Sequence, residues 1–280
     1  MAFIQRDLEP QLLSETPPKA IVLYGSRHIG KKTVVTQLTK TASSVRWFDG
    51  DTLTAQNQLQ FNSTTDVELT LRQADVIVIE EAQRIQNIGL ILKQLVDENI
   101  RLNLGKKIVA IANTSLDLAK SVTECAVGRL VHQQMWPLSI SEIANHKSWG
   151  DVCQNVERLM IYGTYPAVLT DPDYAESTLK RYYDTPLYKD LFALPDIRHR
   201  DKLMLLVTRL AFNVGKEVSY ESLARETGLN KMTVADYLQR LEQYFIIKIC
   251  PSFSRNLSNE LKKGKKGLLL RQWHSKRHHW

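Results

Sequence analysis

The residues with the clearest chemical potential lie in the stretch "YGSRHIGKKT". Gly25, Gly30 and Lys31 fit the spacing of a phosphate-binding loop, which has a glycine, four residues, Gly-Lys and then Ser or Thr. The glycines let backbone N–H groups face phosphate oxygens, and the lysine adds a point charge. Lys32 takes the position of the hydroxyl that would hold magnesium, and a hydroxyl follows only at Thr33. The stretch therefore predicts a nucleotide site with an altered metal position.

A pair of carboxylates ends a later apolar run, "VIVIEE". Glu80 and Glu81 stand where ATPases with such a loop place Asp–Glu, at the end of a buried strand. The alternative interpretation is a Gly-rich turn beside an unrelated acidic helix cap. The loop and the carboxylates occur together at the right spacing, and this combination favours the nucleotide site.

Short apolar runs and helical repeats indicate how these residues are positioned. Four runs are expected to form buried strands: residues 20–24, 45–49, 76–79 and 108–111. Residues 31–42 and 88–98 have helical periodicity. Strands that alternate with helices predict an α/β domain with a mostly parallel sheet, which binds ligands at the carboxyl ends of its strands.

The second half of the chain has a different pattern. From Ser139 to Tyr244 it is mainly helical. Within residues 219–249, two amphipathic segments are separated by Gly228, as in a helix-turn-helix, and "YFIIKI" suits the strand that begins a wing. The fold class predicted is thus an α/β P-loop domain followed by a helical region with a winged helix-turn-helix.

Composition limits the class of protein. No apolar run approaches the roughly 18 residues of a membrane span, and the N-terminus lacks a signal-peptide pattern. The three cysteines form no CxxC pair, so a cytoplasmic protein is expected. The net charge is +7, but the last twenty residues hold seven cations and no acid. The remaining residues therefore sum to zero, and the basic charge describes a tail rather than a DNA-binding body.

Several segments, in consistent order from about residue 4 to 266, carry a family resemblance. They include "LYGSRHIGKKT", "VIVIEEAQRIQNIGLILKQLVDE", "IVAIANTSLDLA", "GRLVHQQMWPLSISE", "YGTYPAVL" and "NVGKEVSYESLARETGLNKMTVADYLQRLEQYFII". The chain resembles prokaryotic AAA-type ATPases with a C-terminal domain named DUF4143. The resemblance implies an AAA-like core over residues 1–137, a helical region over 138–215 and the winged-helix-like start of DUF4143 over 216–266. It also implies ATP and Mg²⁺ as cofactors, and a homo-oligomer or a protein partner.

The resemblance assigns roles to matching positions. The loop contacts of ATP would be Gly25, Ser26, Arg27, Gly30, Lys31, Lys32 and Thr33, with Lys32 in place of a threonine. Glu80 falls at the magnesium-associated aspartate and Glu81 at the glutamate that polarises water. Asn113 lies in a segment similar to a γ-phosphate sensor, although the family usually has Gly-Ser-Ser there. Arg129 matches a Gly-Arg step and implies a contact with phosphate or with a neighbouring subunit.

Both magnesium positions have changed in this chain. Magnesium requires near-ideal octahedral oxygen geometry, which Glu80 fits less well than aspartate and which the Lys32 ammonium opposes. We expect ATP to bind with weakened magnesium dependence and with slow or absent hydrolysis, Lys32 lying against the phosphates. In the alternative, Lys32 faces solvent and Thr33 or water completes an ordinary site. A different class of function is a non-enzymatic winged-helix regulator, for which the nucleotide is a switch or a relic.

The winged helix itself has two interpretations. If its second helix entered a DNA groove, Asn230, Lys231, Thr233 and Asp236 would reach bases or phosphates. Residues 219–244 carry three cations against four acids, whereas non-specific DNA affinity comes mainly from neutralised phosphates. Packing or a protein contact is therefore favoured over DNA binding through residues 219–266.

The last residues, 267–280, do not continue the resemblance. "GLLLRQWHSKRHHW" has no apolar period, and shifting its reading frame by one nucleotide gives a sequence similar to the next strand of the family. We therefore expect an aberrant basic tail, produced by a frameshift that truncates the C-terminal module. A metal-binding tract at His274, His278 and His279 is the alternative.

Overall fold

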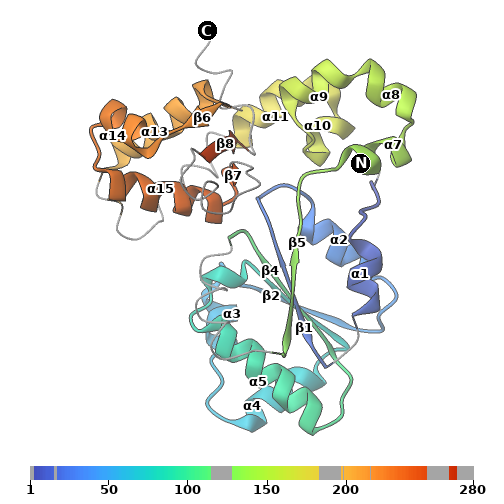
Figure 1. Cartoon of the computed structure of the whole chain (residues 1–280). Coiled ribbons are helices and arrows are strands. Elements are labelled where there is room, and N and C mark those ends of the chain that lie inside the picture. The colour runs from blue at the N-terminus through green and yellow to red at the C-terminus, as the bar shows by residue number, and fades with distance from the viewer. Residues whose placement is uncertain are drawn as a thin grey trace, which may run out of the picture. The chain divides into compact units, whose positions relative to one another are not determined.

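A computed structural model shows the chain as two compact units, residues 1–148 and 149–280 (Figure 1). It describes residues 3–15, 18–114, 128–182, 197, 199–214 and 216–250, and the backbone of 265–269. Within these ranges no helix combines the length and the hydropathy of a membrane span.

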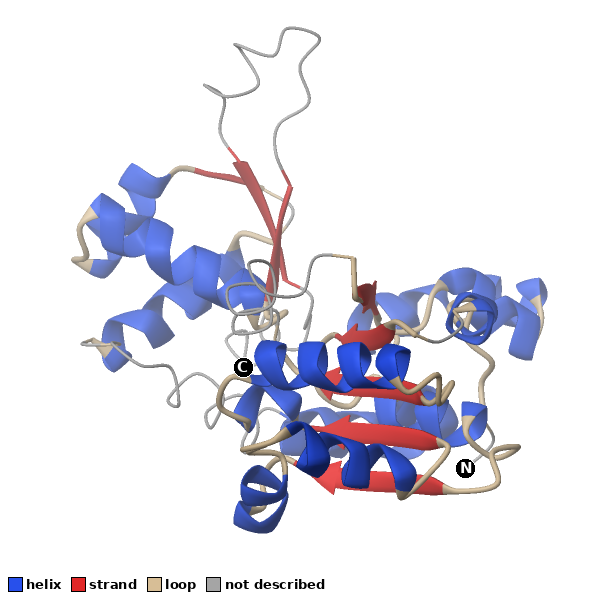
Figure 2. Ribbon diagram, turned by 90° about the horizontal axis from the view of Figure 1, so that it is seen from below, coloured by secondary structure: helices blue, strands red, loops and turns tan. Residues whose placement is uncertain are grey.

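The first unit is built on a five-stranded sheet with the order β2-β3-β4-β1-β5, in which every pairing is parallel. The strands are β1 (Ala20–Tyr24), β2 (Val45–Asp49), β3 (Val76–Glu80), β4 (Lys107–Ala112) and β5 (Leu130–Gln134). All carboxyl ends therefore meet at one edge, so the ends of β1, β3 and β4 lie close together although they are far apart in sequence (Figure 2).

Helices cover both faces of this sheet (Figures 1 and 2). The helices of this unit are α1 (Glu9–Ser14), α2 (Lys31–Leu38), α3 (Leu53–Gln58), α4 (Thr64–Arg72), the 3₁₀ turn η1 (Ala82–Arg84) and α5 (Ile88–Arg101), followed after β5 by α7 (Ile140–His146), which lies beyond the sheet. Side chains alternate along each buried strand, so Val22 packs with α5 whereas Ile21 and Leu23 face α1 and α2.

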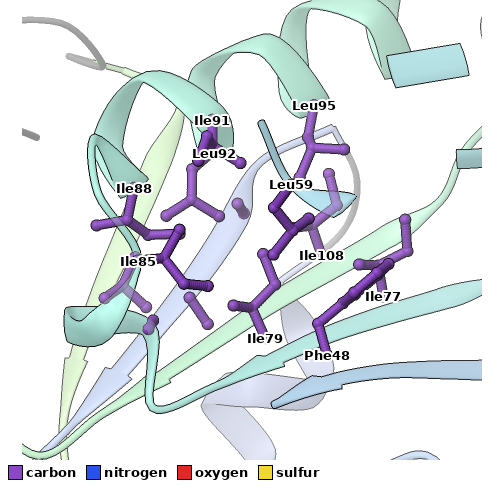
Figure 3. Close-up of a cluster of buried hydrophobic side chains, with 14 of the residues drawn as sticks. Phe48, Leu59, Ile77, Ile79, Ile85, Ile88, Ile91, Leu92, Leu95 and Ile108 are labelled. Atoms are coloured by element: carbon purple, nitrogen blue, oxygen red, sulfur yellow. The ribbon is translucent and has the colours of Figure 1, made fainter. Parts of the chain in front are cut away.

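The main core lies between the sheet and α3, α4 and α5 (Figure 3). Leu92 and Leu95 of α5 are fully buried against Ile77 and Ile79 of β3. Burying such side chains is worth about 1.5–3 kcal/mol each before the entropy cost of ordering them. This core fixes the positions of β3 and β4 in the sheet. It therefore also fixes the positions of the polar residues at the carboxyl ends of these strands.

The four strands expected from the apolar runs are confirmed, and β5 is an addition. Its sequence, "LVHQQ", is only half-buried and carries three polar residues, so it lacks the signal of a buried strand. Helix α2 ends at Leu38, earlier than the expected residue 42, whereas α5 continues to Arg101, beyond the expected residue 98.

The second unit begins with short helices. They are α8 (Trp149–Gln154), α9 (Val156–Tyr162), α10 (Pro166–Thr170), the 3₁₀ turn η2 (Pro172–Tyr174) and α11 (Ala175–Tyr182). A glycine and a proline separate two of them: Gly163 ends α9 and Pro166 opens α10.

A winged helix follows, with the order α13 (Arg200–Phe212), β6 (Glu217–Val218), α14 (Tyr220–Thr227), α15 (Lys231–Gln243), β7 (Ile247–Cys250) and β8 (Lys265–Leu269). Ser219 caps α14, Gly228 ends it in the left-handed conformation (φ 64°), and Asn230 caps α15. The strands pair antiparallel in the order β6-β8-β7. The predicted winged helix-turn-helix is thus confirmed.

The expectation that the fold stops at residue 266 is wrong. Residues 267–269 belong to β8, where Gly267 pairs with Ile249 and Leu269 with Ile247. The run "GLL" at residues 267–269 is too short to reveal an apolar period. The rest of the predicted tail, with His274, His278 and His279, lies outside the described residues.

Candidate functional site

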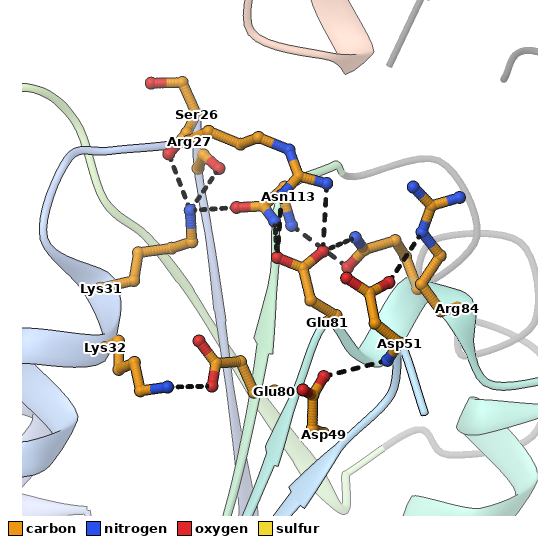
Figure 4. Close-up of polar contacts among 12 residues, drawn as sticks. Ser26, Arg27, Lys31, Lys32, Asp49, Asp51, Glu80, Glu81, Arg84 and Asn113 are labelled. Atoms are coloured by element: carbon orange, nitrogen blue, oxygen red, sulfur yellow. Dashed lines mark hydrogen bonds and ion pairs between the residues drawn. The ribbon is translucent and has the colours of Figure 1, made fainter. Parts of the chain in front are cut away.

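The loop from Gly25 to Gly30 links the end of β1 to the start of α2 at the carboxyl edge of the sheet (Figure 4). Gly30 has a left-handed backbone (φ 94°) at the cap of α2. A Cβ at Gly25 would lie 2.2 Å from the carbonyl oxygen of Met135, so only glycine fits this close approach. The two glycines of the motif are therefore required by backbone geometry.

Lys31 ties the loop to β4. Its side chain is 5% exposed, and Nζ donates to the carbonyl oxygens of Gly25 and Ser26 at 2.8 and 2.7 Å and to Oδ1 of Asn113 at 2.7 Å (Figure 4). The predicted phosphate lysine and the predicted sensor asparagine thus meet directly. The oxygens that accept in these three contacts belong to two backbone carbonyls and an amide, which are neutral groups.

Lys32 contacts Glu80, so the two residues predicted to occupy altered magnesium positions are paired with each other. Nζ of Lys32 lies 2.7 Å from Oε2 of Glu80, and the side chains are 63% and 22% exposed. The ammonium also lies 5.5 Å from the centroid of the Trp47 ring, within cation–π range. The sequence interpretations placed Lys32 either over the phosphates or in solvent, and neither named Glu80 as its partner.

Glu81 is held by four donated hydrogen bonds (Figure 4). Arg27 of the loop donates from both terminal nitrogens, at 3.0 Å to Oε1 and 3.2 Å to Oε2. Asn113 donates to Oε1 and Gln83 to Oε2, each at 2.6 Å. A carboxylate offers about four lone-pair positions, so these donors use its accepting capacity.

The backbone of Glu81 is also unusual. Its φ of 49° is left-handed, a conformation that costs a non-glycine residue of order 1 kcal/mol or more. The strain occurs where β3 turns into η1 and directs the side chain toward the phosphate loop. Such local strain persists because surrounding contacts determine it, and here those contacts come from Gln83, Asn113 and Arg27.

Two other predicted residues are placed apart from this network. Thr33 is exposed on α2, one residue and about 100° of helix rotation beyond the lysine that contacts Glu80. Arg129 precedes β5, and its carbonyl bonds to Ala20 at the amino end of β1, the sheet edge opposite the loop. Its guanidinium pairs with Asp97 of α5. The structure therefore does not bring Arg129 to the phosphate loop of its own chain.

Arg6 was not identified from the sequence, and its buried side chain contacts the loop. Its side chain is 6% exposed and forms an ion pair of 2.9 Å with the equally buried Glu142. It also donates to the carbonyl oxygens of Ile29 and Trp136. The sequence "SISE" gave one signal, because Ser139 and Glu142 form a capping box at the start of α7. Gln83 was missed as well, since nothing in the sequence shows its contact with Glu81.

The candidate DNA or partner residues lie at the start of α15. The side chain of Asn230 accepts a hydrogen bond from the backbone N–H of Thr233, so it caps the helix. Lys231 forms an ion pair with Glu221 of α14. Further exposed pairs in this unit are Arg209–Glu226, Arg240–Asp236 and Lys248–Glu242. These cations are already partnered by acids.

Comparison with protein families identifies the first unit. The family model described as an AAA domain matches residues 17–144, and the first unit has an AAA-like parallel α/β fold. A model described as a domain of unknown function (DUF8612) matches residues 153–270. The family model that matches the second unit is thus DUF8612 and not the expected DUF4143, and the match runs from the helical region through β8.

Solved structures of low sequence identity are also similar. The Orc1 protein of Aeropyrum pernix in complex with DNA is 14% identical, with a TM-score of 0.41 over 96% of this chain and 88% of that one. AMPPCP-bound DnaA from Aquifex aeolicus is 13% identical, with a TM-score of 0.34 over 86% and 89%. A RuvB variant from Thermotoga maritima is 15% identical, with a TM-score of 0.36 over 87% of each chain. A search of curated proteins finds no significant match.

Proposed function

We propose that this protein binds ATP in the loop from Gly25 to Lys31 without requiring magnesium, and that it hydrolyses ATP slowly or not at all. The observation that carries the proposal is the ion pair of 2.7 Å between Lys32 and Glu80. An ordinary site of this kind would have a hydroxyl at the first position and an acidic metal partner at the second. Here a lysine neutralises the acid.

The residues at these two positions do not fit a magnesium ion. Magnesium takes oxygen ligands in octahedral geometry, and an ammonium is not a ligand. A unit charge repels another by roughly 4 kcal/mol at 4 Å and an effective dielectric of about 20, and a divalent ion would feel more. Among the described residues, no group of three or more His, Cys, Asp or Glu side chains is arranged to hold a metal ion. We infer that Lys31 and Lys32 supply the positive charge for the phosphates.

Slow hydrolysis is supported by the state of Glu81. A residue that polarises an attacking water must accept a hydrogen bond from that water. The oxygens of Glu81 already accept from Arg27, Asn113 and Gln83. Asn113 and Gln83 keep donating to Glu81 even when Arg27 is bound elsewhere, so Glu81 is a poor general base.

Calorimetric titration of ATP, with magnesium and then with EDTA, tests the proposal. We expect affinities that agree within about twofold, because the cation's place is taken by Lys32. Binding that requires magnesium would contradict the proposal, and so would a steady turnover above about 1 s⁻¹ that Lys31→Ala abolishes.

Paired substitutions sharpen the test. The double variant Lys32→Thr with Glu80→Asp restores both oxygen ligands, so it should make ATP binding depend on magnesium. Lys40→Thr is the matched control, because it removes an exposed lysine just beyond the end of α2. We expect Lys40→Thr to leave the ratio of the two affinities unchanged.

A second candidate function is the binding of a protein partner by the winged helix. Met232, in the first turn of α15, is 84% exposed beside the paired residues Lys231 and Glu221. An exposed methionine among neutralised charges suits a protein surface better than a phosphate backbone. A salt-dependent mobility shift with DNA that disappears when residues 219–266 are removed would favour DNA as the partner instead.

A further inference from the structure

We propose that Arg27 is a specificity-determining residue that distinguishes nucleoside triphosphates from diphosphates. In the free protein it is held by Glu81, and a bound γ-phosphate takes it over. This inference rests on the proposed ATP binding and concerns the same loop.

The first support is the geometry of the Arg27–Glu81 contact. Both terminal nitrogens of the guanidinium face both oxygens of the carboxylate, at 3.0 and 3.2 Å. The planar fork of an arginine matches a phosphate in the same bidentate way. A phosphate can therefore replace the carboxylate with no change in the type of contact that Arg27 makes.

The second support is that Glu81 keeps partners when Arg27 leaves. Asn113 and Gln83 each donate to one of its oxygens at 2.6 Å, and both are neutral side chains (Figure 4). Removing Arg27 thus leaves the carboxylate hydrogen-bonded to two donors and frees two accepting positions. This compensation lowers the cost of the exchange, since a buried carboxylate without partners would be strongly destabilising.

The third support is the position of Arg27 relative to Lys31. Both side chains come from the loop, and Asn113 joins them: it accepts from Lys31 and donates to Glu81, the partner of Arg27. Lys31 marks where the phosphate chain enters. Arg27 lies toward Glu81, at the side where a terminal phosphate would be attacked. A triphosphate therefore extends to Arg27, and a diphosphate ends short of it.

One consequence is a site that responds to the length of the phosphate chain. With a diphosphate the pair between Arg27 and Glu81 stays closed. With a triphosphate Arg27 moves to the γ-phosphate and Glu81 is released. The two loaded states then differ in how the loop is connected to the ends of β3 and β4.

The test is the ratio of the dissociation constants for ADP and for the triphosphate analogue AMPPNP, both measured by calorimetry in EDTA. Glu81→Gln removes the charge that competes for Arg27, so AMPPNP should bind about tenfold more tightly and ADP within twofold of wild type. Arg27→Gln should weaken AMPPNP binding about tenfold or more and again leave ADP within twofold. The double variant should have the ratio of Arg27→Gln.

Two control variants separate this role from general charge effects. Arg27→Lys keeps the charge without the fork and should give an intermediate ratio. Arg84→Gln removes the same charge from η1, where Arg84 pairs with Asp51 at 3.4 Å, and should leave the ratio unchanged. Thermal unfolding of each variant shows whether the fold is retained.

The outcomes distinguish the two proposals. If wild type binds both nucleotides and neither Glu81→Gln nor Arg27→Gln changes the ratio, this inference is wrong while ATP binding stands. If Arg84→Gln changes the ratio as much as Arg27→Gln, the effect is unspecific and the inference is also wrong. If wild type binds neither nucleotide, both proposals fail.

Discussion

The polar contacts of the two units differ in how the chain makes them. At the nucleotide edge, they join residues that are far apart in sequence: 48 positions for Lys32–Glu80, 54 for Arg27–Glu81 and 82 for Lys31–Asn113. In the winged helix they join residues that are closer in sequence: 4 positions apart for Arg240–Asp236, 10 for Lys231–Glu221 and 17 for Arg209–Glu226.

This difference separates contacts that the fold imposes from contacts that local helix geometry provides. The first kind exists only when the parallel sheet is formed, so each pair reports on the alignment of strands. The second kind is exposed to solvent, is worth about 0.2–1 kcal/mol and is screened by salt. We therefore expect substitutions in the first unit to have larger and more specific effects.

The largest expected effect comes from the buried ion pair between Arg6 and Glu142. Arg6→Met leaves Glu142 buried without its ionic partner and removes the donor to Ile29, which should lower the free energy of unfolding by about 3–5 kcal/mol. Denaturant unfolding measures the change. Arg72→Met, in the exposed pair with Glu68, is the matched control and should cost less than about 1 kcal/mol. Equal losses of unfolding free energy in the two variants would contradict the expected difference between contacts that the fold imposes and exposed local contacts.

The second-largest effect is expected at Gly25, whose backbone lies close to the carbonyl oxygen of Met135. In Gly25→Ala the new methyl group would meet the carbonyl oxygen of Met135 at 2.2 Å and the side chain of Ile29 at 2.7 Å. We expect a loss of about 1–3 kcal/mol of stability, because the loop must shift away from β5. ATP affinity, measured by calorimetry, should fall as well. A variant with normal affinity would show that the loop position is not critical.

A smaller effect is expected from the exposed pair of the winged helix. Lys231→Gln leaves Glu221 in solvent, so the free energy of unfolding should change by less than about 1 kcal/mol. The difference should decrease further in high salt. A larger loss of unfolding free energy that does not depend on salt would show that this pair behaves like the contacts that the fold imposes.

The smallest expected effect is on the stability of the protein in acid. We compare two carboxylates, Glu98 of the first unit and Glu221 of the second. Hydrogen bonding from Arg101 lowers the pKa of Glu98, and hydrogen bonding from Lys231 lowers that of Glu221. A carboxyl whose folded pKa is lowered stabilises the protein at neutral pH, and this contribution is lost as the pH falls through the folded pKa, below about pH 4.

Unfolding followed from pH 7 to pH 3 measures this effect. Glu98→Gln and Glu221→Gln should each be less stable than wild type at pH 7, and both differences should shrink below about pH 4. The side chain of Glu98 is 6% exposed and that of Glu221 67%, so the larger difference is expected for Glu98→Gln. The reverse order would contradict the contrast between the units.

The sequence predicted the parts of the fold that depend on continuous apolar runs. Strands β1 and β3 are buried on both faces, and such runs have few alternatives in a soluble protein. Strand β5 was missed because its half-buried residues include His132, Gln133 and Gln134. Residues 267–269 of β8 were assigned to an aberrant tail, since five residues give too little sequence to define a strand pattern.

For the site, the sequence predicted positions but not directions. It placed Arg27, Lys31, Glu80, Glu81 and Asn113 at one edge because parallel strands end together. It did not predict that Lys32 forms an ion pair with Glu80 or that Arg27 forms one with Glu81, because spacing along the chain does not specify a side-chain rotamer. Arg129 shows the same limit, since the family pattern gave a residue type without showing which sheet edge it occupies.

The position of β8 in its sheet has a consequence for how the second unit is synthesised. This strand lies in the middle of the order β6-β8-β7 although it is the last of the three along the chain. Among the strands that the structure describes, neither β6 nor β7 has a sheet neighbour until residues 265–269 have left the ribosome. Helices α13, α14 and α15 emerge first and form the early core, and the unpaired strand edges are exposed to aggregation until translation supplies the central strand.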